Sequence, residues 1–299
     1  MDKVYLTGEN LNIMSKTIGP AMKSQDKAPI QKMAEEQTAA GVDYIDINLG
    51  PARKGGPEMM EFVVKTVQEV TDTPLFLDTT NAEAIEAGLK VYQRKNDIKP
   101  VINSISCRPE RMELLMPMAK KYDAACVGLL MGTEGIPRDE NERGMLATDF
   151  LMKSAEAGIP NEDIFMDPIV VPVSSQQIQV QGTTNFMMMF RDIAPGCNGT
   201  CGLSNISNGA PDHLRGILDR TYMVIINQFG MSGAIMNYQD KELISLMRGE
   251  KQEIYDFIIS VFNGEEVDPA SLDKEKLDYY KTVKILIGEN LYSDSWLDL

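Results

Sequence analysis

Short runs of apolar and β-branched residues alternate along this chain with longer segments whose apolar residues recur at helical spacing. The runs predict eight strands, at Val4–Glu9, Tyr44–Leu49, Leu75–Thr79, Pro100–Ile105, Ala125–Leu130, Ile164–Val170, Thr200–Asn205 and Ala234–Tyr238. The longer segments predict helices, at Ile30–Ala40, Pro57–Val70, Asn81–Arg94, Pro109–Lys121, Asn141–Ala157, Gln176–Asp192 and Asp212–Gln228. Strands that alternate with helices are joined by right-handed crossovers into a parallel sheet. Eight such units predict an α/β fold, a closed (β/α)8 barrel.

An open doubly wound sheet is the alternative architecture. It would place a glycine-rich turn after the first strand, whereas the chain there reads Thr7-Gly-Glu-Asn10. Beyond the last predicted strand the pattern predicts three more helices, at Lys241–Arg248, Gln252–Phe262 and Leu272–Lys284. We therefore expect a single domain over residues 1–299, with the barrel over 1–249 and a C-terminal helical extension over 250–299. That extension could enlarge the outer ring or form a dimer surface.

Composition limits the possible partners and compartment. A net charge of −15 repels phosphate backbones and anionic lipids, so it disfavours binding to nucleic acids or membrane surfaces. The N-terminus lacks the basic start and apolar run of a signal peptide, and no stretch approaches the ~20 apolar residues of a membrane span. Four cysteines in 299 residues do not suggest a disulfide framework. These features indicate a cytoplasmic protein with free thiols.

The residues at the ends of the predicted strands indicate the chemistry, because the active site of such a barrel lies at the carboxyl ends of its strands. These ends read Gly8-Glu9-Asn10, Asp46-Ile-Asn48, Asp78-Thr-Thr-Asn81, Asn103-Ser104, Gly128-Leu-Leu-Met131, Asp167-Pro168, Ser204-Asn205 and Asn237-Tyr238. They contain carboxylates and carboxamides but no Lys, Arg or His. A Schiff-base aldolase needs a lysine there, and the zinc hydrolases of this fold need several histidines, whereas His213 is the single histidine of the sequence. Both classes are disfavoured.

A rim of carboxylates and carboxamides suits a neutral, flat heterocycle. A carboxylate accepts two parallel N–H bonds, and an amide donates one and accepts one. A 2-amino-4-oxo-pyrimidine ring, as in a pterin, offers the complementary donors and acceptor. Strand-end Asp and Asn can also cap the following helix, so the stretch Asp78-Thr-Thr-Asn81 has a purely structural interpretation as well.

Seven motifs give the chain a family resemblance. They are GENLN (8–12), DINLGP (46–51), LDTTN (77–81), VINS (101–104), GTEGIPRD (132–139), MDPIVVP (166–172) and GLSNIS (202–207), with a further echo in YSDSW (292–296). In this order and spacing the sequence resembles the pterin-binding methyltransferases that use methyltetrahydrofolate and a corrinoid protein, which have a TIM-barrel fold like that of dihydropteroate synthase. The resemblance extends from Gly8 to about Asp240.

The resemblance implies roles for individual residues. Asp78, Asn103 and Asp167 would hold the pterin ring. Gly202 and Ser204 would close around it, and Asn205 would reach N5 as the catalytic residue. Arg215 and Arg220 fall where the family has arginines, although the loop before Arg215 looks longer here, and Arg215 is taken as a pterin-binding residue.

The implied reaction moves a methyl group between N5 of tetrahydrofolate and the cobalt of a corrinoid carried on another protein. Methyltetrahydrofolate or tetrahydrofolate is then the substrate, cobalamin comes with the corrinoid partner, and no metal is bound by this chain alone. The resemblance also favours a homodimer. Because cob(I)alamin is itself a strong nucleophile, positioning is the main task of the protein. Asn205 would stabilise the charge on protonated N5 through its carbonyl oxygen.

Three other functions remain open from the residues. Dihydropteroate synthase shares the fold and the pterin, but its family holds a diphosphate with basic residues where this chain has Ser204-Asn-Ile-Ser and Asn237-Tyr-Gln. A catalytically silent folate-binding subunit of a corrinoid complex would not need Asn205. Mg²⁺-dependent lyase or hydrolase chemistry would require Glu9, Asp46 and Asp167 to converge.

Two local patterns are assigned no function. The run Asp212-His-Leu-Arg-Gly216 nearly matches a corrinoid-binding pattern, but its acid lies one residue too close to His213, which is interpreted as a surface or helix-start histidine. Cys197 and Cys201 have metal-like spacing, yet a zinc site usually needs four ligands, and Cys107 and Cys126 lie far away in the sequence. They are interpreted as structural thiols.

Overall fold

Eight parallel strands surround the centre of the molecule in the computed structural model, which describes residues 4–298. They are β1 (Tyr5–Asn12), β2 (Tyr44–Asn48), β3 (Leu75–Asp78), β4 (Val101–Ser106), β5 (Ala125–Leu129), β6 (Ile164–Asp167), β7 (Asn198–Gly199) and β8 (Gly233–Met236). Their order in the sheet is β7-β6-β5-β4-β3-β2-β1-β8. A parallel bridge between Gly202 and Ile235 brings the two edges together. The expected (β/α)8 barrel is confirmed.

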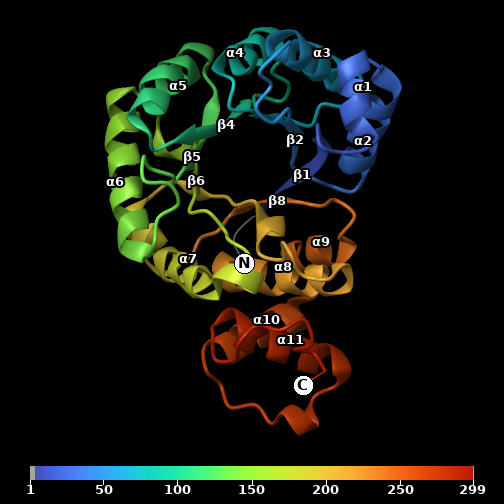
Figure 1. Cartoon of the computed structure of the whole chain (residues 1–299), viewed down its shortest axis with the longest axis vertical. Helices are drawn as coiled ribbons and strands as arrows, with labels where there is room; N and C mark the ends of the chain where they lie inside the picture. Colours follow the sequence, from blue (N-terminus) through green and yellow to red (C-terminus); the bar gives the residue numbers. More distant parts are fainter. Residues whose placement is uncertain (1–3, 299) are drawn as a thin grey trace.

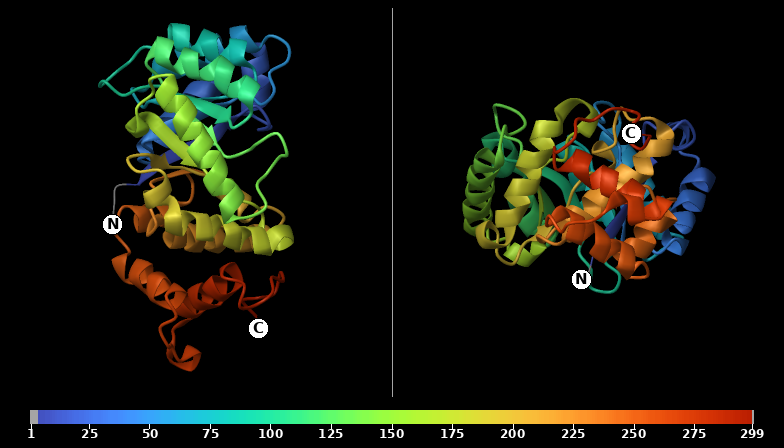
Figure 2. Two further views of the ribbon diagram at one scale, coloured as in Figure 1. Left: turned by 90° about the vertical axis from the view of Figure 1, so that its left-hand side faces the viewer. Right: turned by 90° about the horizontal axis from the view of Figure 1, so that it is seen from below.

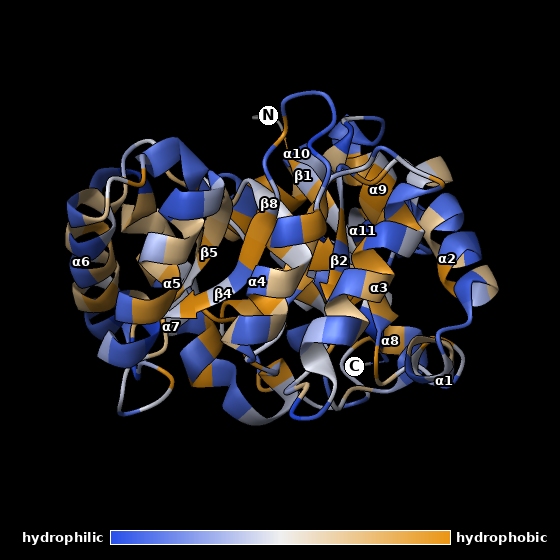
Figure 3. Cartoon of the chain, turned by 90° about the horizontal axis from the view of Figure 1, so that it is seen from above, coloured by the Kyte–Doolittle hydropathy of each residue, from blue (hydrophilic) through white to orange (hydrophobic). Residues whose placement is uncertain are grey.

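Helices form a ring around these strands (Figure 1). They are α1 (Ile18–Ser24), α2 (Lys27–Ala39), α3 (Gly56–Gln68), α4 (Ala82–Val91), α5 (Pro109–Tyr122), α6 (Glu140–Glu156), α7 (Val173–Ile193), α8 (Asp212–Asn227) and α9 (Lys241–Met247). Hydrophobic residues run along the central strands β4, β5 and β8, and hydrophilic residues are frequent on the outer sides of the helices (Figure 3). The short helix α1 was not predicted from the sequence.

The chain after the ring forms two more helices, α10 (Gln252–Phe262) and α11 (Lys274–Leu286), which lie against α7 and α8 (Figures 1 and 2). The Tyr255 hydroxyl donates to Asn227 Oδ1 of α8 at 2.8 Å, and Gln177 Nε2 of α7 donates to Ile285 O at 2.7 Å. Within residues 4–298, no helix is long and apolar enough to cross a membrane. The expected domain bounds also take in residues 1–3 and 299, which lie outside the described residues.

The seventh strand differs from its prediction over Thr200–Asn205. Strand β7 comprises Asn198–Gly199, and Leu203–Asn205 form a 3-10 helix, η2. Leu203 and Ile206 are both fully buried. Their spacing of three is that of a helical turn, whereas a strand would place every second residue on one face. Ser204 and Asn205 therefore do not end a strand but lie on a turn beside the strand ends.

Aromatic side chains fill the interior of the barrel below the strand ends. Tyr5, Tyr44, Phe76 and Phe165 come from four different strands and meet edge to face, with the Tyr44 and Phe76 ring centroids 5.1 Å apart. Side chains two residues further along a strand point to the same side. Asp46 and Asn48 therefore follow Tyr44 into the interior, and Asp78 follows Phe76. The aromatic layer thus forms a floor beneath a polar layer.

Candidate functional site

The polar layer is built by neighbouring strands in matched register. Asn48 on β2 pairs with Asp78 on β3, which pairs in turn with Asn103 on β4. The Asn48 carboxamide donates a hydrogen bond to Asp78 Oδ2, and Asn103 Nδ2 donates to Asp46 Oδ1 at 3.0 Å. The structure therefore brings together Asp78 and Asn103, which were predicted separately as site residues. Asn48 lies beside Asp78, and Asp46 is bonded to Asn103.

Burial controls the charge of these carboxyl groups. It raises the pKa of Asp78 from 3.8 to about 7. The pKa of Asp46 also lies well above 3.8, first because its carboxyl is buried and then because the Asp78 charge is near; the bond from Asn103 opposes this shift. Two close carboxyl groups in a poorly hydrated site tend to share a proton at neutral pH. The layer can therefore both donate and accept hydrogen bonds.

Asp167 ends β6 on a strained turn. Its Oδ1 accepts a hydrogen bond from Ile169 N at 2.8 Å, and Ile169 has a φ of 65°, which a β-branched residue rarely adopts. The buried Arg143 side chain of α6 donates from Nε to Pro168 O at 2.9 Å and so holds the same turn. Burial raises the pKa of Asp167 to about 7. The turn fixes this carboxyl at the same end of the barrel as Asp78.

The predicted residues Gly202, Ser204, Asn205 and Arg215 lie together at η2. Ser204 Oγ donates to Glu9 Oε1 of β1 at 2.8 Å. Arg215 donates from Nε to Ser207 Oγ at 3.3 Å and from Nη2 to Ser204 O at 3.5 Å. Asn205 is exposed beside Ser204. The hydrogen bonds of Ser204 thus fix the turn that presents the Asn205 carboxamide.

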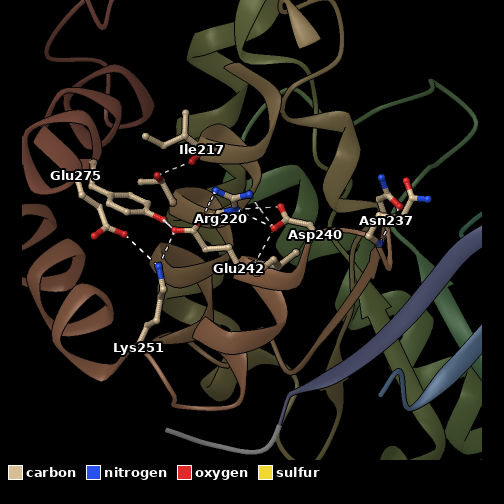
Figure 4. A network of polar contacts seen from close by, with 11 residues as sticks. Ile217, Arg220, Asn237, Asp240, Glu242, Lys251 and Glu275 are labelled. Carbon is tan, nitrogen blue, oxygen red and sulfur yellow. Dashed lines mark hydrogen bonds and ion pairs between the residues drawn. The ribbon is translucent and has the colours of Figure 1, made fainter. Parts of the chain in front are cut away.

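Arg220 has a different environment from Arg215. Its guanidinium lies 2.9 Å from Asp240 Oδ1 and 2.5 Å from Glu242 Oε2, so it belongs to an ion-pair network between α8, α9 and the C-terminal helices (Figure 4). The same network contains Lys251, whose Nζ lies 3.0 Å from Glu242 and 3.1 Å from Glu275. Arg220 is thus neutralised by its own chain, whereas Arg215 reaches the η2 turn.

A cavity of about 280 Å³ opens above Asp78 and Asn103. Two arginines of the β4–α5 segment line it. Arg108 donates from Nε to Gly132 O at 3.3 Å, and Arg111 donates from Nη1 to Thr80 O at 2.9 Å. Sequence reasoning missed this basic pair because it inspected the strand ends, and the arginines follow a few residues later.

Other residues of the site were missed or left without a role. Glu9, Asp46 and Asn48 stood in the recognised motifs at strand ends, but Glu9 and Asp46 were considered only as ligands in the Mg²⁺ alternative, and Asn48 was given no role. Asp219 in the middle of α8 carried no sequence signal. Burial raises its pKa to about 7, and its Oδ1 is buried without a hydrogen-bond partner in the described part of the chain.

The two patterns assigned no function agree with that interpretation. His213 is exposed near the start of α8, and Cys107, Cys126, Cys197 and Cys201 are free thiols. Among residues 4–298, no three His, Cys, Asp or Glu side chains are grouped closely enough to hold a metal ion. The carboxylates required by the Mg²⁺ alternative therefore do not converge. Asn81 has the structural role considered for it, because its Oδ1 caps α4 at Glu83 N and Ala84 N, at 3.0 and 3.2 Å.

Comparisons with curated proteins agree with this geometry. A methylcorrinoid:tetrahydrofolate methyltransferase of Eubacterium limosum is 26% identical over 243 residues, which are 81% of this chain and 88% of that protein. A methionine synthase of Mycobacterium leprae is 23% identical over 241 residues, which are 78% of this chain but 20% of that protein.

Solved structures show the same fold. The dihydropteroate synthase of Thermus thermophilus matches with a TM-score of 0.60 at 18% identity, covering 84% of this chain and 94% of that one. The 7,8-dihydropteroate synthase of Vibrio fischeri matches with a TM-score of 0.61 at 17% identity, again covering 84% and 94%. The family model described as pterin binding enzyme matches residues 8–235. Since this match spans most of the barrel and its polar layer, the chain belongs to the pterin-binding enzymes.

Proposed function

We propose that this protein transfers a methyl group between N5 of tetrahydrofolate and the cobalt of a corrinoid carried by a second protein. The observation that carries the proposal is the exposed Asn205 carboxamide on η2, beside a layer of carboxyl and carboxamide groups. The similarity to a methylcorrinoid:tetrahydrofolate methyltransferase supports the same reaction.

The pterin would lie on the polar layer. The 2-amino group and the ring N–H of the pterin need hydrogen-bond acceptors, and its 4-oxo group needs a donor. The carboxyl groups of Asp78 and Asp167 offer acceptors, and Asn103 offers an amide. Parallel N–H donors favour an ionised carboxylate, so binding lowers the raised pKa of the carboxyl that receives them. Gly202 and Ser204 would close the site at the η2 side, and Arg215 would hold that turn.

The corrinoid protein is the second substrate, and its reduced cobalt supplies the nucleophile. This chain has to place N5 in line with the cobalt and stabilise positive charge on the amine that leaves. Asn205 is suited to that task because its carbonyl oxygen can approach a protonated N5. We include in the proposal a homodimer, as the family resemblance suggests, and a single domain over 1–299 with the barrel over 1–249, as the sequence pattern suggests.

Two other functions make different demands on the site. Dihydropteroate synthase needs cations for a diphosphate. The η2 turn presents Ser204 and Asn205 there, and the neighbouring Arg215 is bonded to the turn itself. The Arg108 and Arg111 pair lies across the barrel, beyond β4. A silent folate-binding subunit would bind folate without transferring the methyl group. We favour the transferase over both.

The test is to mix the purified protein anaerobically with methyltetrahydrofolate and chemically reduced cobalamin, and to follow the cob(I)alamin absorbance. Loss of this absorbance with formation of methylcobalamin, dependent on both protein and folate, is the expected result. Folate binding with no transfer, either to free cobalamin or to a corrinoid protein, would favour the silent subunit. Absence of folate binding would overturn the pterin site itself.

A further inference from the structure

Glu9 is bonded to the turn that carries Asn205. It lies on β1 two residues after the buried Thr7, and its Oε1 accepts the Ser204 hydroxyl at 2.8 Å. The two residues are 195 positions apart in the sequence, so the fold itself brings them together. Ser204 directly precedes Asn205, the residue proposed to face N5. Glu9 is therefore in direct contact with the residue that precedes Asn205.

The surroundings of Glu9 favour a carboxyl group that holds a proton. Its side chain is half-buried, and burial is the largest cause that raises its pKa above 4.5. The Glu9 charge contributes to the raised pKa of Asp46 on β2 and of Asp219 on α8, so these carboxyl groups disfavour one another's ionisation. The Ser204 hydroxyl and the Arg215 guanidinium act in the opposite direction. No Lys, Arg or His forms an ion pair with Glu9 among residues 4–298, whereas each carboxylate of the Arg220 network has such a partner.

A proton is required at this place by the reaction. When methyltetrahydrofolate gives its methyl group to cob(I)alamin, the C–N5 bond breaks and a C–Co bond forms. Cobalt is oxidised from Co(I) to Co(III), and N5 retains the electron pair of the broken bond, which must bind a proton. Asn205 has no acidic proton to give. The reverse reaction releases the same proton from N5.

We propose that Glu9, acting through the Ser204 hydroxyl, holds the proton that N5 gains when the methyl group leaves and takes it back in the reverse reaction. The proposal rests on the methyl-transfer function proposed above. Protonated Glu9 donates to Ser204 Oγ, and the serine hydroxyl passes its own hydrogen towards N5, directly or through one water. Transfer of the methyl group to cobalt leaves Glu9 as a carboxylate, whose charge Arg215 stabilises, and the reverse transfer protonates Glu9 again. Glu9 is thus a positioning and proton-holding residue, because it acts through Ser204.

The substitution Glu9→Gln separates the effect of the Glu9 carboxyl proton from the effect of the hydrogen bond between Glu9 and Ser204. Glutamine retains an oxygen that accepts the Ser204 hydroxyl, so η2 stays in place, but its amide does not titrate. In the wild type, transfer from methylfolate to cobalt should slow as pH rises through the pKa of Glu9, and transfer in the opposite direction should become faster. In Glu9→Gln the inflection at the pKa of Glu9 should disappear from both pH profiles, while the one-proton difference between the two directions remains, and the forward rate constant should fall roughly 100-fold at the acidic end. The dissociation constant of methyltetrahydrofolate should change less than about threefold.

Two further variants make the test decisive. Ser204→Ala keeps the carboxyl group but removes the relay, so it should lose the same pH dependence as Glu9→Gln. Glu35→Gln removes an exposed carboxylate of α2 and should behave as the wild type. A readout independent of turnover is the infrared difference spectrum between the folate-bound and free protein, which should contain a protonated-carboxyl band that Glu9→Gln lacks.

The outcomes separate this inference from the proposed function. If the wild type transfers methyl groups and Glu9→Gln keeps the wild-type pH dependence in both directions, Glu9 does not hold the proton, although the transferase function stands. Absence of a Glu9-dependent carboxyl band overturns the inference equally. If the wild type transfers no methyl group to any corrinoid acceptor, the proposed function fails and the role of Glu9 fails with it.

Discussion

Asn103 Nδ2 on β4 lies 3.0 Å from Asp46 Oδ1 on β2, so a buried hydrogen bond crosses the inner face of β3. Strand β3 contributes Asp78 directly between them, with its register partners Asn48 and Asn103 on either side. One amide thereby orients a carboxyl group that is otherwise costly to bury. The polar layer is consequently one connected unit, and a change at one member alters the others.

Substitution of Asn103 should therefore affect both binding and the carboxyl pair. Asn103→Ala removes the amide proposed to contact the pterin and leaves Asp46 without its donor. We expect the dissociation constant of methyltetrahydrofolate to rise at least about tenfold, as one lost buried hydrogen bond costs about 1–3 kcal/mol. Glu35→Gln, on an exposed face of α2, is the control and should stay within about threefold of the wild type, given that surface substitutions away from a site cost little. Equal effects of the two variants in a binding titration would contradict this assignment.

The buried carboxyl groups predict a pH-dependent stability for the protein without folate. Asp78 and Asp167 keep their protons to about pH 7 in the folded chain and lose them near 3.8 in the unfolded chain. Between these values the folded state binds more protons, so the free energy of unfolding should fall as pH rises from about 5 to about 7. In Asp167→Asn the free energy of unfolding should fall less over this pH range, by on the order of 1–4 kcal/mol, because the Asp167 carboxyl no longer contributes.

Urea unfolding at about pH 5 and about pH 7 measures this difference. The wild type should lose more stability than Asp167→Asn between the two pH values, and saturating methyltetrahydrofolate should reduce the loss in the wild type. Glu35→Gln, on an exposed face of α2, serves as the control and should follow the wild type. If Asp167→Asn and the wild type show the same change with pH, the Asp167 carboxyl is ionised throughout.

Much of the barrel could be predicted from the sequence because strands and helices have different periods. Seven of the eight predicted strands overlap an observed strand, and β2 begins at Tyr44 as expected. Strand β7 was wrong because Leu203 and Ile206 are spaced as in a helical turn, and a short apolar run does not distinguish the two conformations. The short helix α1 was missed for a similar reason.

The candidate site was predictable as far as single residues go, but its pairings were not. Strand-end position predicted that Asp78 and Asn103 lie at the same end of the barrel. Their direct register is a finding of the structure. The family resemblance selected Arg215 as the pterin-binding arginine, but the physical difference from Arg220 could not be predicted: both are on α8, and it depends on Asp240 and Glu242, which pair with Arg220. The contact between Glu9 and Ser204 depends on the η2 turn, which the sequence did not indicate.

The η2 turn supplies a test of Asn205. Asn205→Ala should lower the methyl-transfer rate constant roughly 100-fold while changing folate affinity far less, because the carboxamide interacts with charge that develops during transfer. Asn208→Ala, an exposed asparagine on the following turn, should retain wild-type rates. Stopped-flow measurement of cob(I)alamin loss gives the rate constant, and equilibrium titration gives the affinity. Equal losses in rate and affinity would contradict the proposed role of Asn205.

Gly202→Ala tests the same carboxamide without removing it. A Cβ atom at Gly202 would lie 3.0 Å from Asn205 Nδ2, which is tighter than most contacts of a Cβ atom. The asparagine must therefore shift, and we expect a slower transfer than in the wild type with a smaller loss than in Asn205→Ala. In the double variant Gly202→Ala/Asn205→Ala the alanine at 202 should add nothing further, since the group it displaces is gone. Additive losses would place the effect of Gly202 elsewhere.

The ion-pair network around Arg220 joins the barrel to the C-terminal helices (Figure 4). Arg220 binds Asp240 and Glu242. Two more residues reach Glu242: the Tyr279 hydroxyl of α11 donates to its Oε1 at 3.0 Å, and Lys251 connects it to Glu275. Asp240 also caps α9 by accepting from Leu243 N at 2.9 Å. These partners are half-buried, so they are screened less by salt than exposed pairs. The network therefore fixes α10 and α11 against α8.

Arg220→Met should consequently destabilise the chain without weakening folate binding. The variant leaves Asp240 and Glu242 as close negative charges without their shared cation, and we expect a loss of about 2–3 kcal/mol in urea unfolding. Lys27→Met, which breaks the exposed Lys27–Glu69 pair, should cost about 0–1 kcal/mol. Limited proteolysis should cleave Arg220→Met faster in the segment 263–269, since the helices on either side of it lose their attachment. If folate affinity falls more than stability does, Arg220 contacts the substrate and the network is not its main role.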